Sequence, residues 1–225
     1  MRFTLAKVKK ESSDVWSFVF RPDNPLLWKP GQYLRYHIDD PAADDRGENR
    51  FFTISTAPFE KYPQITTRIS PKSSSFKMKL FDLRLGQEIT AFGPNGKFFI
   101  DDPNKRYVMI AGGIGITPFR SILMDLNHQK LSVDITLLYA NKTTEIVFQK
   151  ELEEIAKQSL GLKIRYFIGE NKLTASSLQN LSFDLKSTIF YISGPEMMMK
   201  SFVQILESLG VPPENIRHDF FPGYE

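Results

Sequence analysis

A glycine-rich turn is the first segment of this sequence whose residue types could hold a ligand. The run Ala111–Pro118 reads AGGIGITP and follows an apolar stretch that predicts a strand. Glycines allow the backbone to approach a ligand closely, and a helix that begins at Pro118 would direct its N-terminal dipole toward an anionic group. Because the run lacks the full GxGxxG spacing, it is also compatible with a tight strand–helix turn that binds nothing.

A second segment, Arg50–Ser55, combines a cation, aromatic rings and hydroxyl groups. In an extended strand Arg50 and Phe52 project to the same side, whereas Thr53 points away or into a bend. An arginine fork can hold a pyrophosphate, a phenylalanine ring can stack on a planar heterocycle, and a threonine hydroxyl can hydrogen-bond the edge of that heterocycle. Taken alone, the segment reads more simply as an ordinary edge strand with one solvated arginine.

The composition excludes several kinds of chemistry. The 225 residues include Lys+Arg 29 and Asp+Glu 26, and a net charge of +3 is too small to indicate nucleic-acid binding. The absence of cysteine excludes disulfides, thiolate catalysis and cysteine-ligated zinc or iron–sulfur clusters. The 3 histidines are scattered without the spacing of metal ligands, so no metal site is expected. Any redox chemistry must therefore come from a bound organic cofactor.

The sequence carries no visible targeting segment. Its first residues lack the apolar core of a secretory signal. The most apolar stretch, Tyr107–Ile116, is far shorter than the ~20 residues that a membrane helix needs. We therefore expect a soluble cytoplasmic protein that does not contact a membrane.

The elements that would position these residues divide the chain into two parts. Up to about residue 100, aromatic and β-branched residues alternate in short runs, which is typical of a barrel or sandwich. The exception is a helical pattern at Phe76–Leu85, with Ser75 as its expected N-cap. After the polar run 101–106, apolar runs alternate with helical patterns, which favours a parallel sheet covered on both faces. The expected strands are Tyr107–Ala111, Val133–Tyr139, Leu162–Ile168 and Thr188–Ile192, and the expected helices are Pro118–Leu126, Glu145–Lys157 and Pro195–Leu209.

The order of the motifs is more specific than any one of them. The series is Pro30–Tyr33, Arg50–Thr53, Ser74–Lys77, Gly93–Phe98, Gly112–Pro118, Tyr139–Asn141, Ser193–Met197 and Phe220–Tyr224. Over almost the whole chain it resembles the ferredoxin–NADP reductase superfamily in its compact bacterial two-domain form. The resemblance implies an antiparallel Greek-key β-barrel that binds FAD, residues 1–102, followed by an α/β parallel-sheet domain that binds the nicotinamide nucleotide, residues 103–225.

The resemblance also implies which residues bind FAD. Arg50 matches the arginine that grips the FAD pyrophosphate, Phe52 the aromatic residue against the isoalloxazine, and Thr53 the hydroxyl residue near flavin N5. Tyr224 is a candidate to cover the other face of the flavin, and a frayed C-terminal tail is the alternative. The remaining residues expected at FAD are Arg68, Ser74, Ser75, Phe76 and Thr117.

A second set is implied for NAD(P)H. Relatives often have cysteine at Ser193, near the nicotinamide carbon that gives up the hydride, and many have tyrosine at Phe52. At Phe52 we expect stacking to survive while a hydrogen bond to the ribityl chain is lost, and at Ser193 we expect function with a changed hydride rate. Thr53 and Ser193 are thus the expected catalytic residues. The residues expected at NAD(P)H are Gly112, Gly113, Gly115, Thr117, Asn141, Ser193, Gly194, Pro195 and Met197.

The implied activity is that of an FAD-dependent NAD(P)H oxidoreductase. Hydride would pass from NADH or NADPH to FAD N5, and electrons would then pass to ferredoxin, flavodoxin or an oxygenase component; we expect a monomer. The alternative is a flavin-binding electron-relay or regulatory subunit without efficient NAD(P)H turnover. Nucleotide preference stays open, because Lys142–Thr144 could bind a 2′-phosphate that Glu145 would repel. Four cations on the barrel's helix are either solvated or able to steer an acidic electron-accepting protein, namely Lys72, Lys77, Lys79 and Arg84.

Overall fold

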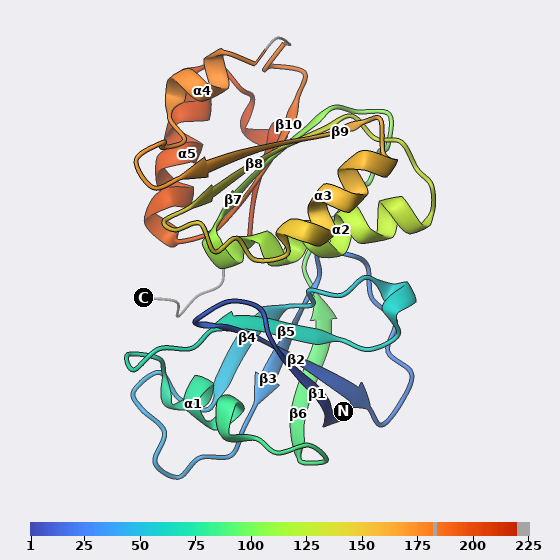
Figure 1. Cartoon of the computed structure of the whole chain (residues 1–225), viewed down its shortest axis with the longest axis vertical. Helices are drawn as coiled ribbons and strands as arrows, with labels where there is room; N and C mark the ends of the chain where they lie inside the picture. The colour runs from blue at the N-terminus through green and yellow to red at the C-terminus, as the bar shows by residue number, and fades with distance from the viewer. Residues whose placement is uncertain (182–183, 220–225) are drawn as a thin grey trace.

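Six antiparallel strands form the first sheet of the computed structural model, which describes residues 1–181 and 184–219. The strands are β1 (Arg2–Lys10), β2 (Val15–Pro22), β3 (Tyr33–His37), β4 (Asn49–Thr53), β5 (Gln64–Arg68) and β6 (Glu88–Asn95). Their order is β4-β3-β6-β1-β2-β5, and the edge strands β4 and β5 contact each other, so the sheet closes almost completely (Figure 1). The antiparallel barrel predicted for the N-terminal half is confirmed.

The barrel interior is filled by aromatic side chains from alternate strand positions. Phe18, Phe20 and Tyr36 are fully buried there, because every second residue of a strand points to the same side. Helix α1 (Ser75–Asp82) packs Phe76 and Leu80 against the same core. The large number of phenylalanines in the chain is thus partly explained by the barrel interior.

Helix α1 differs from its prediction at both ends. Ser74, not Ser75, is the N-cap, because its extended backbone lets its Oγ accept a hydrogen bond from the Lys77 amide at 3.3 Å. The helix ends at Asp82, since Leu83 is already extended and the turn that follows leads into β6.

Five parallel strands form the second sheet, in the order β11-β10-β7-β8-β9. The strands are β7 (Tyr107–Gly112), β8 (Ile135–Asn141), β9 (Leu162–Ile168), β10 (Ile189–Ser193) and β11 (Ile216–His218). The helices are α2 (Thr117–His128), α3 (Gln149–Gln158), α4 (Ala175–Gln179) and α5 (Glu196–Ser208), and the 3-10 turns are η1 (Pro58–Glu60), η2 (Gly113–Ile116) and η3 (Pro213–Asn215).

Helices cover both faces of this parallel sheet, as predicted. In β7 the residues Tyr107, Met109 and Ala111 face the core under α2 and α3, whereas Val108 and Ile110 face the core under α4 and α5. Figure 1 shows the two helix layers on opposite sides of the sheet. This double coverage explains why the strand sequences are apolar at every position instead of alternating.

Three elements of the second domain depart from the sequence prediction. Helix α3 begins at Gln149 instead of Glu145, because Phe148 adopts a left-handed conformation with φ 61° and packs in the core. The short elements α4 and β11 were not predicted. At the end of α5, Gly210 has φ 78°, the left-handed conformation in which glycine commonly ends a helix.

Helix α2 lies between the parallel sheet and the barrel, and it joins the two domains (Figure 1). The Arg120 guanidinium is 5% exposed and donates from Nη1 to the Ser55 carbonyl at 2.8 Å. It also bonds Glu60 of the barrel at 2.9 Å and Glu151 of α3 at 2.8 Å. The neighbouring Ser121 hydroxyl donates to the Thr56 carbonyl at 2.7 Å.

Apolar contacts continue across the same interface. Val15, at the start of β2, and Phe98, just after β6, belong to the hydrophobic core that also contains Phe119 and Ile122 of α2. The chain passes from one sheet to the other between Asn95 and Tyr107. A domain boundary between residues 102 and 103 lies in this connection and stays a prediction.

No helix within residues 1–181 and 184–219 has both the length and the apolar character needed to span a membrane.

We predict that Arg120→Met lowers the free energy of unfolding by about 2–4 kcal/mol, because it leaves the partly buried Glu60 carboxylate without Arg120 and Glu151 with only Lys9, at 3.9 Å. Urea unfolding at pH 7 measures the change. The control is Arg2→Met. The Arg2 side chain is 68% exposed and pairs with Asp23 and Glu88, and exposed ion pairs contribute only ~0–1 kcal/mol to stability. Equal losses in the two variants would contradict the role given to Arg120.

Candidate functional site

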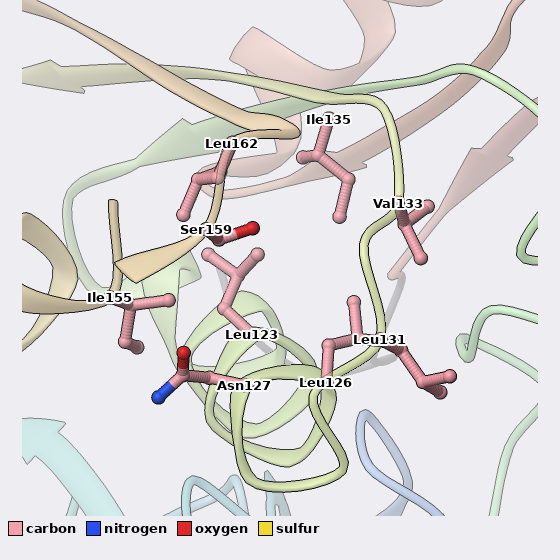
Figure 2. A pocket seen from close by; sticks show the side chains of 9 residues that line it. All are labelled: Leu123, Leu126, Asn127, Leu131, Val133, Ile135, Ile155, Ser159 and Leu162. Carbon is pink, nitrogen blue, oxygen red and sulfur yellow. The ribbon is translucent and has the colours of Figure 1, made fainter. Parts of the chain in front are cut away.

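The enclosed cavity nearest the start of the parallel strands does not hold a nucleotide. It is lined by apolar side chains such as Leu123, Ile135 and Leu162, and its volume of about 10 Å³ fits roughly one water molecule (Figure 2). Ile135 and Leu162 are the first residues of β8 and β9. Open α/β sheets bind ligands at the opposite, carboxyl ends of their strands. A nucleotide site is therefore expected at those ends.

Two segments predicted to bind NAD(P)H lie in contact at the carboxyl ends of β7 and β10. A Cβ on Gly112 would come within 2.4 Å of the Met198 sulfur, and a Cβ on Gly115 would come within 2.3 Å of the Ser193 carbonyl oxygen. A Cβ on Gly194 would lie 3.1 Å from the Gly112 Cα. Gly115 and Gly194 lie where the two segments pack backbone to backbone, whereas Gly112 makes room for the Met198 side chain.

Gly113 differs from its neighbours in the turn. It has φ 53°, and a Cβ placed on it would meet no atom within 4 Å, so its surroundings are open. The Tyr139 hydroxyl donates to the Gly113 carbonyl at 3.1 Å and fixes the turn against β8. The Nδ2 atom of Asn141, at the end of β8, is buried beside this tyrosine.

The remaining residues expected at NAD(P)H flank this contact. Thr117 is buried at the start of α2, Pro195 is the N-cap residue of α5, and Met197 is exposed in the first turn of α5. The N-termini of α2 and α5 thus lie beside the glycine turn, and both dipoles favour an anionic group there. Glu145 accepts hydrogen bonds from the backbone and hydroxyl of Ser13, which hold the pKa of its carboxyl below the usual range.

Thr53 and Ser193, the two expected catalytic residues, meet at a buried carboxylate from a third segment. The Thr53 hydroxyl donates to Asp219 Oδ2 at 3.2 Å, and the Asp219 amide donates to the Ile192 carbonyl at 2.9 Å. Burial raises the pKa of Asp219 to about 7, although hydrogen bonds from Thr53 and Ser193 oppose the shift. A proton can therefore be held or released at this carboxyl near neutral pH.

Asp219 is not among the site residues predicted from the sequence. The signal that could have found it is the run Ile216–His218, which is too short to read as a strand by itself. However, Ile216–His218 follows the last helix of a pattern in which strands and helices alternate, so it can be read as a fifth parallel strand. Its carboxyl end would then lie at the same sheet edge as Ser193. The residue after it then falls into the site.

Asp219 also lines an open groove between the domains. The groove has a volume of about 580 Å³ and is bounded by Tyr33 and Lys97 of the barrel and by Arg217 of β11. Arg217 bonds Asp101 at 3.0 Å and the Tyr191 hydroxyl at 2.7 Å, so the wall of the groove is fixed. The groove is large enough to admit part of a planar cofactor.

A second group of functional residues surrounds the start of α1. Asp44 Oδ2 accepts a hydrogen bond from the Ser75 amide at 2.9 Å and from Arg46 Nη2 at 2.7 Å. Arg50 Nη2 lies 3.5 Å from Asp44 Oδ1, and Arg50 Nη1 donates to the carbonyl oxygens of its own loop. Hydrogen bonds from Arg46 and Ser75 hold the pKa of Asp44 at about 2. This carboxylate shows that the donors at the helix start are arranged to bind an anion.

Cations from several elements lie near Asp44, and one of them, Arg68, is paired with Asp14 at 3.3 Å. Arg46, Arg50 and Arg68 come from a loop, β4 and β5, and all three act electrostatically on Lys77 in the first turn of α1. A pyrophosphate carries the charge and the acceptor oxygens that such a donor set requires. The residues present therefore fit the diphosphate of FAD.

The aromatic residues expected at FAD lie beside these cations. Arg50 and Phe52 are both buried on one side of β4, as predicted, and Phe52 packs 5.9 Å from Phe76 and 6.0 Å from Tyr36. The Arg50 guanidinium lies 5.8 Å from the centre of the Phe76 ring. The stacking of Phe52 on a flavin stays a prediction. Tyr224 lies outside the described residues.

No group of three or more His, Cys, Asp or Glu side chains that could hold a metal ion occurs in the described part of the chain.

Comparison with known proteins connects these features. Residues 109–204 match the family model of the oxidoreductase NAD-binding domain. The chain is 28% identical to a glycine betaine monooxygenase reductase subunit of Chromohalobacter salexigens, covering 96% of this chain and 62% of that protein. It is 27% identical to a flavohemoprotein of Rhodopirellula baltica, covering 97% of this chain and 60% of that protein. The chain thus spans about three fifths of the length of these relatives.

Two solved structures have the same arrangement of both domains. The FAD/NAD-binding domain of a nitric oxide dioxygenase from Vibrio cholerae superposes with a TM-score of 0.84 at 24% identity, covering 98% of both chains. The cytochrome b5 reductase domain of Ulva prolifera nitrate reductase superposes with a TM-score of 0.81 at 25% identity, covering 97% of this chain and 96% of that one. The two-domain fold is confirmed.

We predict that the stability advantage of Asp219→Asn over the unchanged protein grows between pH 5 and pH 7. In the unfolded chain this carboxyl loses its proton near its ordinary pKa of 3.8, whereas the folded protein keeps the proton up to about pH 7. The unchanged protein therefore loses up to about 1.4 kcal/mol of stability per pH unit in this window, and the amide variant does not.

Urea unfolding of both proteins at several pH values measures the difference. The control is Asp184→Asn, because a hydrogen bond from the Lys186 backbone lowers the pKa of Asp184 and moves its titration below this window. A pH-independent difference between Asp219→Asn and the unchanged protein would show that Asp219 is ionised throughout.

Proposed function

Because this chain belongs to the ferredoxin–NADP reductase superfamily of FAD-dependent NAD(P)H oxidoreductases, we propose that it transfers electrons from NADH or NADPH through FAD to a separate acceptor protein. Bound FAD would supply the redox chemistry, since it accepts a hydride and can release single electrons. The protein supplies binding, orientation and control of a proton. The observation that carries the proposal is the meeting of Thr53, Ser193 and Asp219 where the two domains join.

The barrel residues would hold the cofactor at its diphosphate. Arg50 and the amide of Ser75 already bind the Asp44 carboxylate, and the same donors suit phosphate oxygens. The FAD diphosphate would be bound at the start of α1, and its flavin would extend toward Thr53 at the end of β4. We propose Arg68, Ser74, Phe52 and Phe76 as further contacts.

The α/β domain would hold NAD(P)H at the carboxyl ends of β7, β8 and β10. Gly113 offers an open approach there, and the starts of α2 and α5 favour the nucleotide diphosphate. Ser193 lies at the end of this path nearest to Thr53, since both hydroxyl groups bond Asp219, and Thr117 begins α2 beside the glycine turn. Asn141 lies at the end of β8. Nicotinamide would thus be directed toward the domain junction.

Asp219 would take up or release a proton beside Thr53 and Ser193. Its carboxyl accepts from the Thr53 hydroxyl and from Ser193, so a change in its charge reorients both hydroxyl groups. With a pKa of about 7 it can take up or release a proton during turnover near neutral pH.

The electron acceptor is proposed to be another molecule. The 225 residues contain no cysteine, so they cannot ligate an iron–sulfur cluster by thiolates. Similar proteins include the reductase subunit of a monooxygenase and a reductase of a carbazole dioxygenase system. An oxygenase component, a ferredoxin or a flavodoxin would fit this role.

We predict that the protein reconstituted with FAD loses its yellow flavin absorbance within seconds when NADH or NADPH is added without oxygen. The expected cause is hydride transfer at the junction of the domains, and stopped-flow absorbance measures it. Flavin that binds but is not reduced by either nucleotide would favour an electron-relay or regulatory subunit. A protein that binds no flavin would refute the proposed function.

We predict that Arg50→Gln weakens FAD binding by about 10- to 100-fold, because the charged hydrogen bonds from the guanidinium to the phosphate oxygens are lost. With saturating FAD, the rate of flavin reduction by NADH should change less than about threefold, since the residue contacts the diphosphate and not the reacting ring. Quenching of FAD fluorescence gives the affinity. Arg21→Gln, on an exposed position of β2, is the control and should bind FAD normally. Equal affinities in the two variants would contradict the role of Arg50.

A further inference from the structure

Tyr139 is a buried titratable residue that has no part in the proposed function so far. It lies in β8 opposite Ala111 of β7, and its side chain is fully buried in the core under α2 and α3. Burial raises the pKa of its hydroxyl group, so the group keeps its proton and acts as a donor. A buried phenol needs an acceptor, and the position of that acceptor shows which segment the hydroxyl group fixes.

The Tyr139 hydroxyl lies between two backbone segments at the carboxyl ends of β7 and β8. Its oxygen is 3.1 Å from the carbonyl oxygen of Gly113, in the glycine turn, and 3.4 Å from that of Val147, in the segment before α3. One phenolic proton is thus directed at two carbonyl groups from different loops. Within residues 1–181 and 184–219, no other side chain donates a hydrogen bond to a carbonyl group of the turn Gly113–Ile116.

The segment that contains Val147 is itself fixed to the domain junction. The next residue, Phe148, has a left-handed backbone with φ 61°, which a bulky residue keeps only where its surroundings hold it. The centre of its buried ring lies 5.0 Å from the Arg120 guanidinium, and Arg120 bonds the Ser55 carbonyl of the barrel. The Tyr139 hydroxyl therefore connects the glycine turn to the side chains that join the two domains.

Two other buried tyrosines of the same sheet make the same kind of bond elsewhere. The Tyr107 hydroxyl donates to the Asp102 carbonyl at 2.7 Å. The Tyr191 hydroxyl donates to the Phe99 carbonyl, also at 2.7 Å. Both acceptors lie in the connection that leads from β6 into β7. Tyr139 differs from these two because its hydroxyl group reaches the sheet edge at which NAD(P)H is proposed to bind.

We propose that Tyr139 is a positioning residue for NAD(P)H, whose hydroxyl group holds the glycine turn in the place where the turn receives the nucleotide diphosphate. This inference rests on the proposed function, because it assigns a further residue to the NAD(P)H site. Tyr139 is fully buried and acts through Gly113, whose own surroundings are open. Without the hydroxyl group, the peptide groups of Gly113 lose their anchor, and binding must order them at a cost in free energy.

The test removes the hydroxyl group alone and compares ligands with and without a diphosphate. We expect Tyr139→Phe to bind NADH and ADP-ribose about tenfold more weakly, because the turn is no longer pre-organised. At saturating NADH, the limiting rate of flavin reduction should fall less than about twofold, since the bound nicotinamide meets the same residues. Dihydronicotinamide riboside, which has no phosphate, should reduce the flavin of the variant and of the unchanged protein equally fast. Calorimetry gives the affinity for ADP-ribose, and stopped-flow absorbance gives the rates.

Tyr107→Phe is the matched control, since it removes a buried bond from a hydroxyl to a carbonyl group at the opposite end of the neighbouring strand. In urea unfolding it should lose about as much stability as Tyr139→Phe, while its affinities for NADH and ADP-ribose should equal those of the unchanged protein.

Three results would overturn the proposal: Tyr139→Phe binds ADP-ribose as tightly as the unchanged protein, Tyr107→Phe loses the same affinity, or Tyr139→Phe reacts more slowly with dihydronicotinamide riboside to the same extent as its affinity for NADH falls. The affinity for ADP-ribose does not depend on flavin reduction. If the unchanged protein binds ADP-ribose but neither NADH nor NADPH reduces its flavin, the proposed function is refuted, and the affinities for ADP-ribose still decide the role of Tyr139.

Discussion

The placement of Arg120 is the constraint on which the rest of the structure depends. Its guanidinium is buried where α2 meets the barrel, and its hydrogen bonds reach the Ser55 carbonyl and the carboxylates of Glu60 and Glu151. A buried cation with this many fixed partners allows little sliding or rotation between the domains. Ser55 is only two residues from Thr53, so the same bond fixes the barrel strand that contributes to the site. The contact between Thr53 and Asp219, across the two domains, follows from that fixed arrangement.

The start of α1 and the domain junction, at the two ends of the proposed cofactor path, differ in their electrostatics. At the start of α1, Arg46, Arg50 and the Ser75 amide hold the carboxylate of Asp44, and the same donors suit an incoming anion. At the domain junction, a buried carboxyl is surrounded by hydroxyl groups, and burial makes its neutral form accessible at ordinary pH. The first design provides affinity through charge, and the second provides a group that can change charge. Both depend on backbone positions that the barrel and the parallel sheet fix.

Much of the fold could be predicted from the sequence, because periodicity and turn residues report local structure directly. Four of the described strands of the second domain followed from their continuous apolar runs, and the placement of Arg50 and Phe52 on one side of β4 followed from the two-residue period of a strand. The prediction was wrong where tertiary contacts overrule local preference. Ser74 caps α1 although Ser75 is equally suited, because the Ser75 amide and hydroxyl are bound to Asp44 across the loop. Asp219 was missed because a three-residue strand becomes visible only through its neighbours in the sheet.

The contact between the glycine turn and the segment after β10 limits how these positions can vary. A side chain on Gly194 would press on the backbone of Gly112, and a side chain on Gly112 would meet the Met198 sulfur and the Pro195 ring. A larger residue at Gly112 therefore requires a compensating change at Met198 or Pro195, so the two segments diverge together. Among homologous sequences, substitutions here should occur in correlated pairs, although the residues are far apart along the chain.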